Sequence, residues 1–264
     1  MNKSEASRTV AIHSYKGGTG KTQISVNLAL IWAMKGRNVC LLDYDFRAPS
    51  IGTLFRIQDS SFWINDYLMG RRDIDQVLVD VSAQLHINGK LLLGLANPSL
   101  KAVGEAIGQN EKVQFRSLKR TTKAQKTLLN DFGIEYIIID TSPGPLYSSL
   151  NAVYASDVLL VVLKRDRSDM VGTVRMLEEV YSASLSEKRI IVNMVPPQLD
   201  LGRIKVEVEE KLKVPVIGVI PCYCDFSIAG GESLFALEQP RHGFIEALRK
   251  IGEESIFQGD HSTP

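Results

Sequence analysis

A glycine-rich segment near the N-terminus carries the residues best suited to chemistry. It reads Lys16-Gly-Gly-Thr-Gly-Lys-Thr22, and it stands between an apolar run and a helical pattern. Its three glycines let the backbone wrap closely around phosphate oxygens and direct N–H groups inward, and the start of the helix adds partial positive charge. We expect Lys21 to lie against the β- and γ-phosphates of a nucleotide and the Thr22 hydroxyl to coordinate Mg²⁺. The segment therefore predicts a phosphate-binding loop.

This segment departs from the usual phosphate-loop pattern in one respect. Gly-x4-Gly-Lys-Thr fits only if its first position is relaxed, because Ser14 and Tyr15 precede Lys16. A glycine-rich turn with a chance lysine is the alternative interpretation. The order strand, loop, helix argues against that alternative, because it is the structural context that the motif requires.

Two acidic signals lie further along the chain, each at the end of an apolar run. Asp43 and Asp45 close one run, and they share a side if the strand continues, since residues two apart point to the same face. A carboxylate near the γ-phosphate can orient the attacking water or help to hold hydrated Mg²⁺, whereas the alternative is a turn with two solvated aspartates. Asp140 ends the other run in the form of a Walker B element, and we expect it to bind Mg²⁺ through water. Gly144 follows, free to move its N–H toward a γ-phosphate.

The elements that must position these residues alternate between short β-branched runs and longer helical patterns, which indicates βαβ units and a parallel sheet. The expected helices include 21–34, 111–130 and 242–251. The expected strands are 9–13, 39–43, 90–95, 136–140, 158–163, 189–194 and 214–220. Several are apolar at every position, as strands covered on both faces are. We predict an α/β fold, a P-loop NTPase with a mostly parallel twisted sheet flanked by helices on both faces.

The bulk composition is ordinary for a globular protein. With 264 residues and no internal repeat or linker, we predict a single P-loop ATPase domain over 1–264, with a core of about 9–252 and polar tails. A formal net charge of +1 means that binding to nucleic acid or acidic lipid would need a local patch. Three cysteines, a polar N-terminus and apolar runs too short for a bilayer predict a cytoplasmic protein.

The pattern KGGxGK[ST] resembles the deviant Walker A motif of the ParA/MinD family of P-loop ATPases, and the similarity covers most of the chain. It implies ATP and Mg²⁺ as cofactors, a homodimer with ATP, and a lysine, here Lys16, that reaches the partner's nucleotide. By the same match Asp45 positions the water and Asp43 supports the metal. Gln23 stands where the family usually has Thr or Ser, and Ser142 replaces a proline of Asp-Thr-Pro-Pro-Gly.

The resemblance continues in the C-terminal third. Asn193 matches the family's adenine-contacting asparagine, whose amide can read the N6/N7 edge with donor and acceptor together. Pro221 lies in a segment that resembles the one lining the base, although a strand end and a turn explain it as well. The implied catalytic residues are Lys16, Lys21 and Asp45. The implied nucleotide-binding residues are Gly17, Gly18, Thr19, Gly20, Lys21, Thr22, Gln23, Asn193 and Pro221. The implied metal ligands are Thr22, Asp43 and Asp140.

These motifs leave several functions open. The favoured one is a slow ParA-like ATPase whose ATP dimer binds DNA without sequence preference, acting in chromosome or plasmid partition on the nucleoid with a ParB-like or other activating partner. A MinD-like switch on a membrane is the second, although glutamates in the last helix and a polar tail make membrane binding the less expected outcome. A bacterial-type tyrosine kinase is third, since no tyrosine follows Tyr223. A scaffold for metal assembly rests only on Cys222 and Cys224.

Basic residues could form the DNA-binding patch. The expected helix 111–130 carries several, and a solvated helix face is the alternative. The candidates are Lys112, Arg116, Lys119, Arg120, Lys123 and Lys126, with Arg165, Arg167, Arg203 and Lys205 elsewhere. Phosphate contacts of this kind give salt-dependent affinity rather than a readable sequence code.

Overall fold

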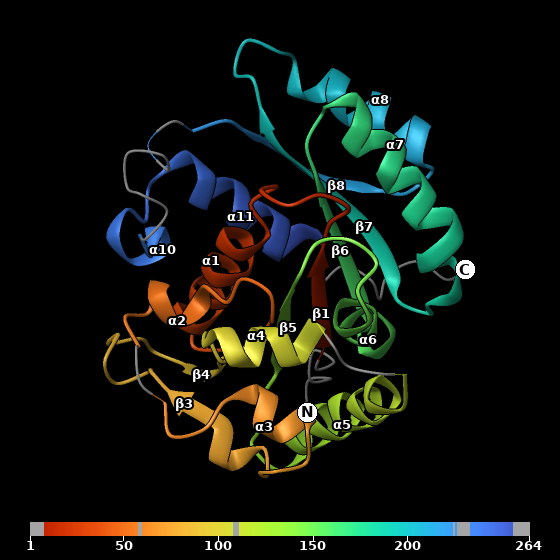
Figure 1. Ribbon diagram of the computed structural model, residues 1–264. Coiled ribbons are helices and arrows are strands. Elements are labelled where there is room, and N and C mark those ends of the chain that lie inside the picture. Colours follow the sequence, from red (N-terminus) through yellow and green to blue (C-terminus); the bar gives the residue numbers. More distant parts are fainter. Residues whose placement is uncertain (1–7, 58–59, 108–110, 224, 226–232, 256–264) are drawn as a thin grey trace, which may run out of the picture.

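The computed structural model describes residues 8–57, 60–107, 111–223, 225 and 233–255. Eight strands form one sheet in the order β3-β4-β2-β5-β1-β6-β7-β8 (Figure 1). Neighbouring strands run parallel except for the pair β3 and β4. The strands are β1 (Arg8–His13), β2 (Asn38–Tyr44), β3 (Leu78–Asp80), β4 (Lys90–Gly94), β5 (Tyr136–Thr141), β6 (Val158–Leu163), β7 (Glu187–Val195) and β8 (Val216–Pro221). The predicted mostly parallel α/β fold is therefore confirmed.

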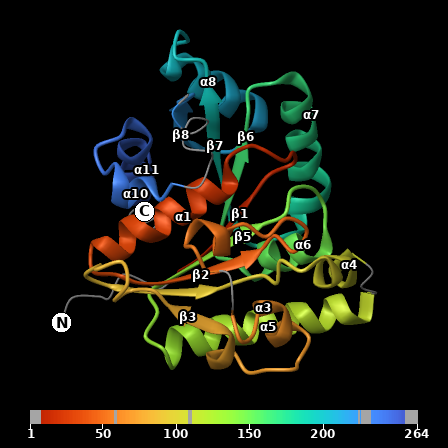
Figure 2. The same cartoon turned by 60° about the vertical axis from the view of Figure 1, so that its left-hand side comes forward.

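Helices cover both faces of this sheet (Figures 1 and 2). The helices are α1 (Lys21–Met34), α2 (Ile51–Leu54), α3 (Ile64–Leu68), α4 (Leu100–Ile107), α5 (Glu111–Asn130), α6 (Tyr147–Ala155), α7 (Arg167–Arg175), α8 (Leu201–Leu212), α10 (Phe235–Glu238) and α11 (Gly243–Ser255). Short turns of other helix types are η1 (Asp75–Val77), η2 (Met176–Val180) and η3 (Tyr181–Ala183). No helix in the described part of the chain has the length and apolar character needed to cross a bilayer.

Two apolar cores lie on opposite faces of the sheet. In β1, Val10 and Ile12 pack with α1, α10 and α11, whereas Ala11 between them packs with the helices of the other face, α5 to α8. All three side chains are fully buried. Burial on both faces explains why the strands are apolar at successive positions instead of alternating.

The observed elements follow the predicted ones closely in the interior of the chain. Helices α1 and α5 have the predicted bounds, and Gly36, with φ of 86°, follows the end of α1 as expected of a C-terminal stop. All seven expected strands are present, with ends shifted by one or two residues. Strand β3 was not predicted, because three residues at a sheet edge carry too little pattern.

The carboxyl ends of the parallel strands meet at one edge of the sheet. Strand β1 lies at the centre, with β5 and then β2 on one side and β6 and then β7 on the other. The loop after β1 therefore has the strand-end carboxylates on the β5 side and the ends of β6 and β7 on the opposite side. In open α/β sheets, ligands bind in the crevice at this edge.

Candidate functional site

The glycine-rich loop connects β1 to α1, and its backbone requires glycine at two positions. Gly18 and Gly20 have φ of 68° and 91°, values that favour glycine. A Cβ at Gly20 would also lie 2.4 Å from the Nδ2 atom of Asn193, so the loop and the end of β7 approach each other too closely for a side chain. Helix α1 begins at Lys21, directly after the loop. Strand, loop and helix thus occur in the order that a phosphate site requires.

A cavity of about 380 Å³ opens at this loop. Its lining brings together most of the predicted phosphate-site residues: Gly17, Gly18, Gly20, Lys21, Thr22, Gln23, Asp45, Arg47, Ala48 and Pro143. A cavity of similar volume (≈ 400 Å³) lies between α2 and the chain after β4, and Arg56 is the only ionisable residue in its lining. The two cavities therefore do not differ in volume. They differ in chemistry, because only the cavity at the loop is lined by Lys21, Thr22 and Asp45.

Thr22 and Asp140 meet at the base of the loop. The Thr22 hydroxyl donates a hydrogen bond of 2.7 Å to Oδ2 of Asp140, and the Ser25 hydroxyl donates one of 2.8 Å to Oδ1. Burial raises the pKa of Asp140 to about 6, against the opposing effects of the Thr22 hydrogen bond and the charge of Lys21. Burial likewise lowers the pKa of Lys21. The Walker B carboxylate and the loop threonine therefore lie in contact, although 118 residues separate them.

The two aspartates at the end of β2, Asp43 within the strand and Asp45 just after it, occupy different environments. Strand β2 ends at Tyr44, so Asp45 leaves the strand, and the condition under which the two carboxylates would share a side is not met. Asp43 is buried opposite Asp140 in the register of β2 and β5, and burial and the nearby Asp140 charge raise its pKa well above the usual range. Asp45 lines the cavity and accepts a hydrogen bond of 2.6 Å from the Ser142 hydroxyl.

These residues fit a magnesium ion. Mg²⁺ prefers oxygen ligands and is commonly held by one or two carboxylates together with phosphate oxygens and water. Thr22 supplies a hydroxyl, and Asp140 and Asp43 supply carboxylates. Oδ2 of Asp43 is buried without a hydrogen-bond partner in the described part of the chain, which is unusual for a buried polar atom. The donor set agrees with the predicted ligands, whose roles stay predictions.

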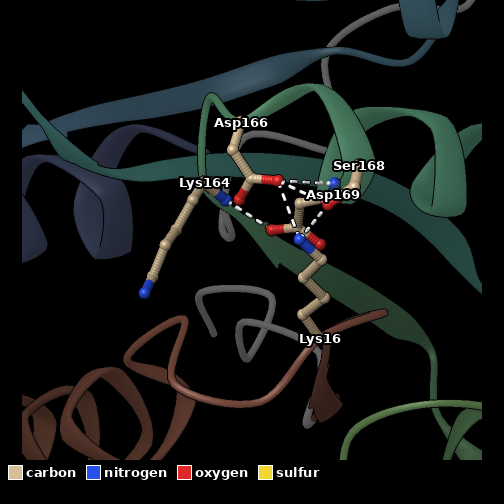
Figure 3. A network of polar contacts seen from close by, with 5 residues as sticks. All are labelled: Lys16, Lys164, Asp166, Ser168 and Asp169. Atoms are coloured by element: carbon tan, nitrogen blue, oxygen red, sulfur yellow. Dashed lines mark hydrogen bonds and ion pairs between the residues drawn. The ribbon is translucent and has the colours of Figure 1, made fainter.

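Lys16 is held by its own chain (Figure 3). Its Nζ lies 2.8 Å from Oδ1 of Asp166, the N-cap residue of α7, and also contacts the Ser168 hydroxyl. The Lys16 hydrogen bond holds the pKa of Asp166 well below its usual range, and Asp166 in turn raises the pKa of Lys16. Asp166 and Ser168 were not among the site residues predicted from the sequence. An N-cap pattern after β6 could have indicated the turn, but not its contact with Lys16.

His13 links the end of β1 to two other segments. Its Nε2 lies 3.0 Å from the carbonyl oxygen of Gly144, and its Nδ1 lies 2.5 Å from the Tyr181 hydroxyl. Because a carbonyl oxygen can only accept, Nε2 carries the proton and Nδ1 accepts from Tyr181. Burial, then the charge of Lys21, lowers the pKa of His13 to about 3, so the ring is neutral. Sequence reasoning missed this residue, since one histidine in an apolar strand carries no signal.

The base end of the site is anchored to the loop. Asn193 is buried, and its Nδ2 donates a hydrogen bond of 2.8 Å to the carbonyl oxygen of Thr19. Pro221 ends β8, the neighbouring strand, and the N–H of the next residue donates to the carbonyl oxygen of Val195. Cys222 is exposed, whereas Cys224 lies outside the described residues. Within the described ranges, no three or more His, Cys, Asp or Glu side chains gather in a group that could hold a metal ion by themselves.

Comparisons with known proteins bear on the family and the fold of the chain. A family model described as an AAA domain (AAA_31) matches residues 7–193. An uncharacterized ATP-binding protein of Methanocaldococcus jannaschii is 28% identical over 212 residues, which are 80% of this chain and 73% of that protein. The septum site-determining protein MinD of Pyrococcus horikoshii, solved in complex with Mg-ADP, has a TM-score of 0.73 at 19% identity, over 94% of this chain and 95% of that one. A plasmid partition protein of Borrelia burgdorferi has a TM-score of 0.69 at 22% identity, over 94% and 97%.

Proposed function

The chain belongs to the ParA/MinD family of P-loop ATPases, and on that premise we propose that it is an ATP-driven dimerisation switch acting in DNA partition. It binds MgATP, forms a homodimer in the ATP state, hydrolyses ATP slowly, and binds DNA without sequence preference. The observation that carries the nucleotide part is the contact between Thr22 and Asp140 below Lys21, because a loop lysine, a hydroxyl and a Walker B carboxylate converge there.

The proposed roles in hydrolysis follow from position. Asp45 lines the cavity and orients the attacking water, while Lys21 lies against the phosphates. Bound Mg²⁺, held by Thr22, Asp140 and Asp43, would neutralise charge that develops on the phosphate oxygens. Lys16 adds positive charge from the partner chain, which is why turnover by a single chain is expected to be slow.

Dimerisation requires Lys16 to change partners. Its side chain is 38% exposed, and both Asp166 and Ser168 are exposed too, so nothing buried must open to free it. Solvent screens an exposed ion pair strongly, so it contributes little and a partner's nucleotide can compete for the lysine. We propose that ATP-bound chains exchange the contact with Asp166 for one with the partner's phosphates.

The DNA part of the proposal rests on α5. Five of its basic residues recur every three or four positions and are all exposed: Lys112, Arg116, Lys119, Lys123 and Lys126. The sixth, Arg120, faces inward and donates to the carbonyl oxygens of Tyr67 and Arg72, so it does not belong to the stripe. With six basic residues and one acidic residue, α5 has a local excess of five positive charges in a chain whose net charge is +1. A row of lysines and arginines is the footprint of phosphate-backbone binding.

The MinD-like alternative places the dimer on a membrane. Its support is the fold, which MinD structures share with plasmid partition proteins at similar TM-scores. A helix that lies on a membrane needs an exposed apolar face. The apolar face of α5 is buried, with Ala124 and Leu128 in the core, and Phe115 is the large apolar side chain exposed beside the stripe. Phosphate backbone is therefore the better match for this surface, and a ParB-like activator would find the dimer on the nucleoid.

Binding of random-sequence duplex DNA by an Asp45→Ala variant tests the proposal. Asp45→Ala should block hydrolysis and trap the ATP state, so we expect salt-sensitive binding with ATP and none with ADP. Each lost phosphate contact should reduce the slope of log K against log[salt] by about 0.9. Lys119→Glu/Lys123→Glu on α5 should weaken binding and lower that slope. The control Lys211→Glu/Lys213→Glu, which changes two exposed lysines at the end of α8, should do neither.

The same binding experiment also distinguishes DNA from a membrane as the surface that the dimer binds. A variant that still dimerises with ATP but binds anionic vesicles instead of DNA would overturn the partition function and favour the MinD-like one. Failure of the chain to bind any nucleotide would contradict both the partition function and the MinD-like function.

A further inference from the structure

Lys164 is a second lysine beside the phosphate loop, and neither the motifs nor the comparisons give it a role. It follows β6, whose six residues are all buried. Its backbone N–H donates a hydrogen bond of 2.8 Å to Oδ2 of Asp169, and Asp169 is itself fully buried. The backbone from which the Lys164 side chain starts is therefore fixed by the strand and by a buried carboxylate.

The side chain of Lys164 points at the loop. Figure 3 shows it extending away from Asp166 and Asp169, in the direction of the segment that leads to α1. Its Nζ lies 3.9 Å from the position that a Cβ would occupy at Gly18. Because Gly18 has no side chain, the ammonium group approaches the loop backbone unobstructed. A phosphate loop presents its backbone to the phosphates, so Nζ stands at the margin of the phosphate site.

The three lysines of this region differ in what they contact. Lys21 is buried at the first position of α1, directly after the loop, and Lys16 is held by Asp166 and Ser168. Within the described ranges no carboxylate forms an ion pair with Nζ of Lys164. Burial raises the pKa of Asp169, and the charge of Lys164 is one of the effects that oppose this rise. Lys164 is thus a half-buried cation next to an anion site with its charge uncommitted.

The sheet order shows which part of a nucleotide this lysine can reach. The residues proposed to act at the γ-phosphate, Asp45 and Asp140, lie on the β5 side of the loop, and Asn193 at the base end lies near the end of β7 on the other side. Lys164 follows β6, between the loop and Asn193. It therefore approaches from the base side, where the α- and β-phosphates connect the γ-phosphate to the nucleoside.

We propose that Lys164 binds the α/β-phosphate portion of the nucleotide held by the same chain, and so sets the affinity for ATP and ADP alike. This inference rests on the proposed nucleotide site. The two lysines then have different roles. Lys164 binds the phosphates that ATP and ADP share, within one chain, whereas Lys16 contacts the nucleotide of the partner chain in the ATP dimer.

The test compares three full-length variants with the wild type in their affinities for fluorescent ATP and ADP analogues, with unlabelled nucleotides as competitors. Lys164→Met removes the charge and keeps the stem, and Lys164→Arg restores the charge. Arg165→Met is the matched control, because Arg165 is the neighbouring exposed base and pairs with Glu207. We expect Lys164→Met to bind both nucleotides about tenfold more weakly, since a hydrogen bond to a charged group is lost. Lys164→Arg should recover most of that loss, and Arg165→Met should stay within about twofold of wild type.

The outcomes separate the inference from its premise. Equal affinities of Lys164→Met and wild type for both nucleotides would overturn the inference while leaving the nucleotide site intact. A loss confined to ATP would also overturn it, because Lys164 would then act on the γ-phosphate or on the partner's nucleotide. If the wild type itself binds neither nucleotide, the proposed function fails first. Thermal unfolding of each variant checks that an observed loss of affinity is not a loss of fold. The described residues show a hydrogen bond for the Lys164 backbone N–H and none for its side chain, so we expect the variants to stay folded.

Discussion

Lys16 and Asp166 are joined by an ion pair of 2.8 Å between residues 150 positions apart, so the lysine assigned to the partner's nucleotide is occupied in the single chain. Any ATP dimer that uses Lys16 must first break this contact. The ion pair therefore opposes dimerisation by the small amount that an exposed pair is worth.

Asp166→Asn should therefore favour the dimer. Asparagine can still cap α7, so the substitution removes the charge and keeps the helix start. We expect the protein concentration at which half of the chains are dimeric in the presence of ATP to fall by up to about fivefold. Light scattering across a dilution series measures it. Glu207→Gln, which neutralises the exposed acid paired with Arg165, is the control and should leave the midpoint unchanged. A midpoint that rises in Asp166→Asn would contradict this account.

Thr22 and Ser25 provide a matched test of the metal site, because both hydroxyls donate to Asp140 and only Thr22 lines the cavity. We expect Thr22→Ala to reduce the gain in nucleotide affinity on adding Mg²⁺ by at least about tenfold. Ser25→Ala should keep most of that gain. The measurement is nucleotide affinity in Mg²⁺ and in EDTA. Equal effects of the two substitutions would mean that Thr22 acts by positioning Asp140 and not by holding the ion.

The parts of this site that could be predicted from sequence are those encoded in contiguous residues. The loop from Lys16 to Thr22 and the run ending in Asp140 each contain their own chemistry, and the strand and helix around them are local patterns. Helix α1 was predicted with its observed bounds because Ile24, Leu28 and Ile31 recur on one face and Gly36 marks its end.

What could not be predicted depends on contacts between distant segments. The partners of Lys16 and His13 lie 150 and 168 residues away, and only the sheet order brings them together. The expected pairing of Asp43 with Asp45 depended on where β2 ends, and strand ends are set by tertiary contacts instead of by local preference. Lys164 was missed for a related reason, since a lysine after a strand has no signature until its neighbour across the sheet is known.

His13 should make the fold sensitive to acid. Its folded pKa of about 3 is below the value of 6.5 expected in the unfolded chain, so between those values the unfolded chain holds a proton that the folded chain does not. Stability is complete above the unfolded pKa and is lost as the pH falls toward the folded one. Between pH 7 and pH 5 this one residue should cost about 2 kcal/mol of unfolding free energy.

The test of His13 compares slopes, not absolute stabilities, because removing the contact with Tyr181 itself destabilises the fold. Denaturant unfolding of His13→Gln at pH 7 and pH 5 should show a smaller loss than the wild type over the same range. His86→Gln removes an exposed histidine and should retain the wild-type slope. An unchanged slope in His13→Gln would mean that other groups carry the acid sensitivity.

Gly172 in α7 provides space for the ring of Tyr15, the residue before Lys16. A Cβ at Gly172 would lie 2.0 Å from a ring carbon of Tyr15. Gly172→Ala should therefore destabilise the fold by about 1–3 kcal/mol, even though alanine is the better helix former. The ring is 38% exposed and can move outward, which favours the lower part of that range. Denaturant unfolding measures the change.

Two further variants isolate the clash between Gly172 and Tyr15. Gly104→Ala places the same substitution in α4, where nothing lies within 4 Å of the new Cβ, and it should stabilise the helix by about 0.5–1 kcal/mol. In a Tyr15→Ala background, Gly172→Ala should lose its cost, because the ring that it meets is gone. A cost that persists in that background would show that α7 needs glycine at position 172 for a reason other than the packing of Tyr15.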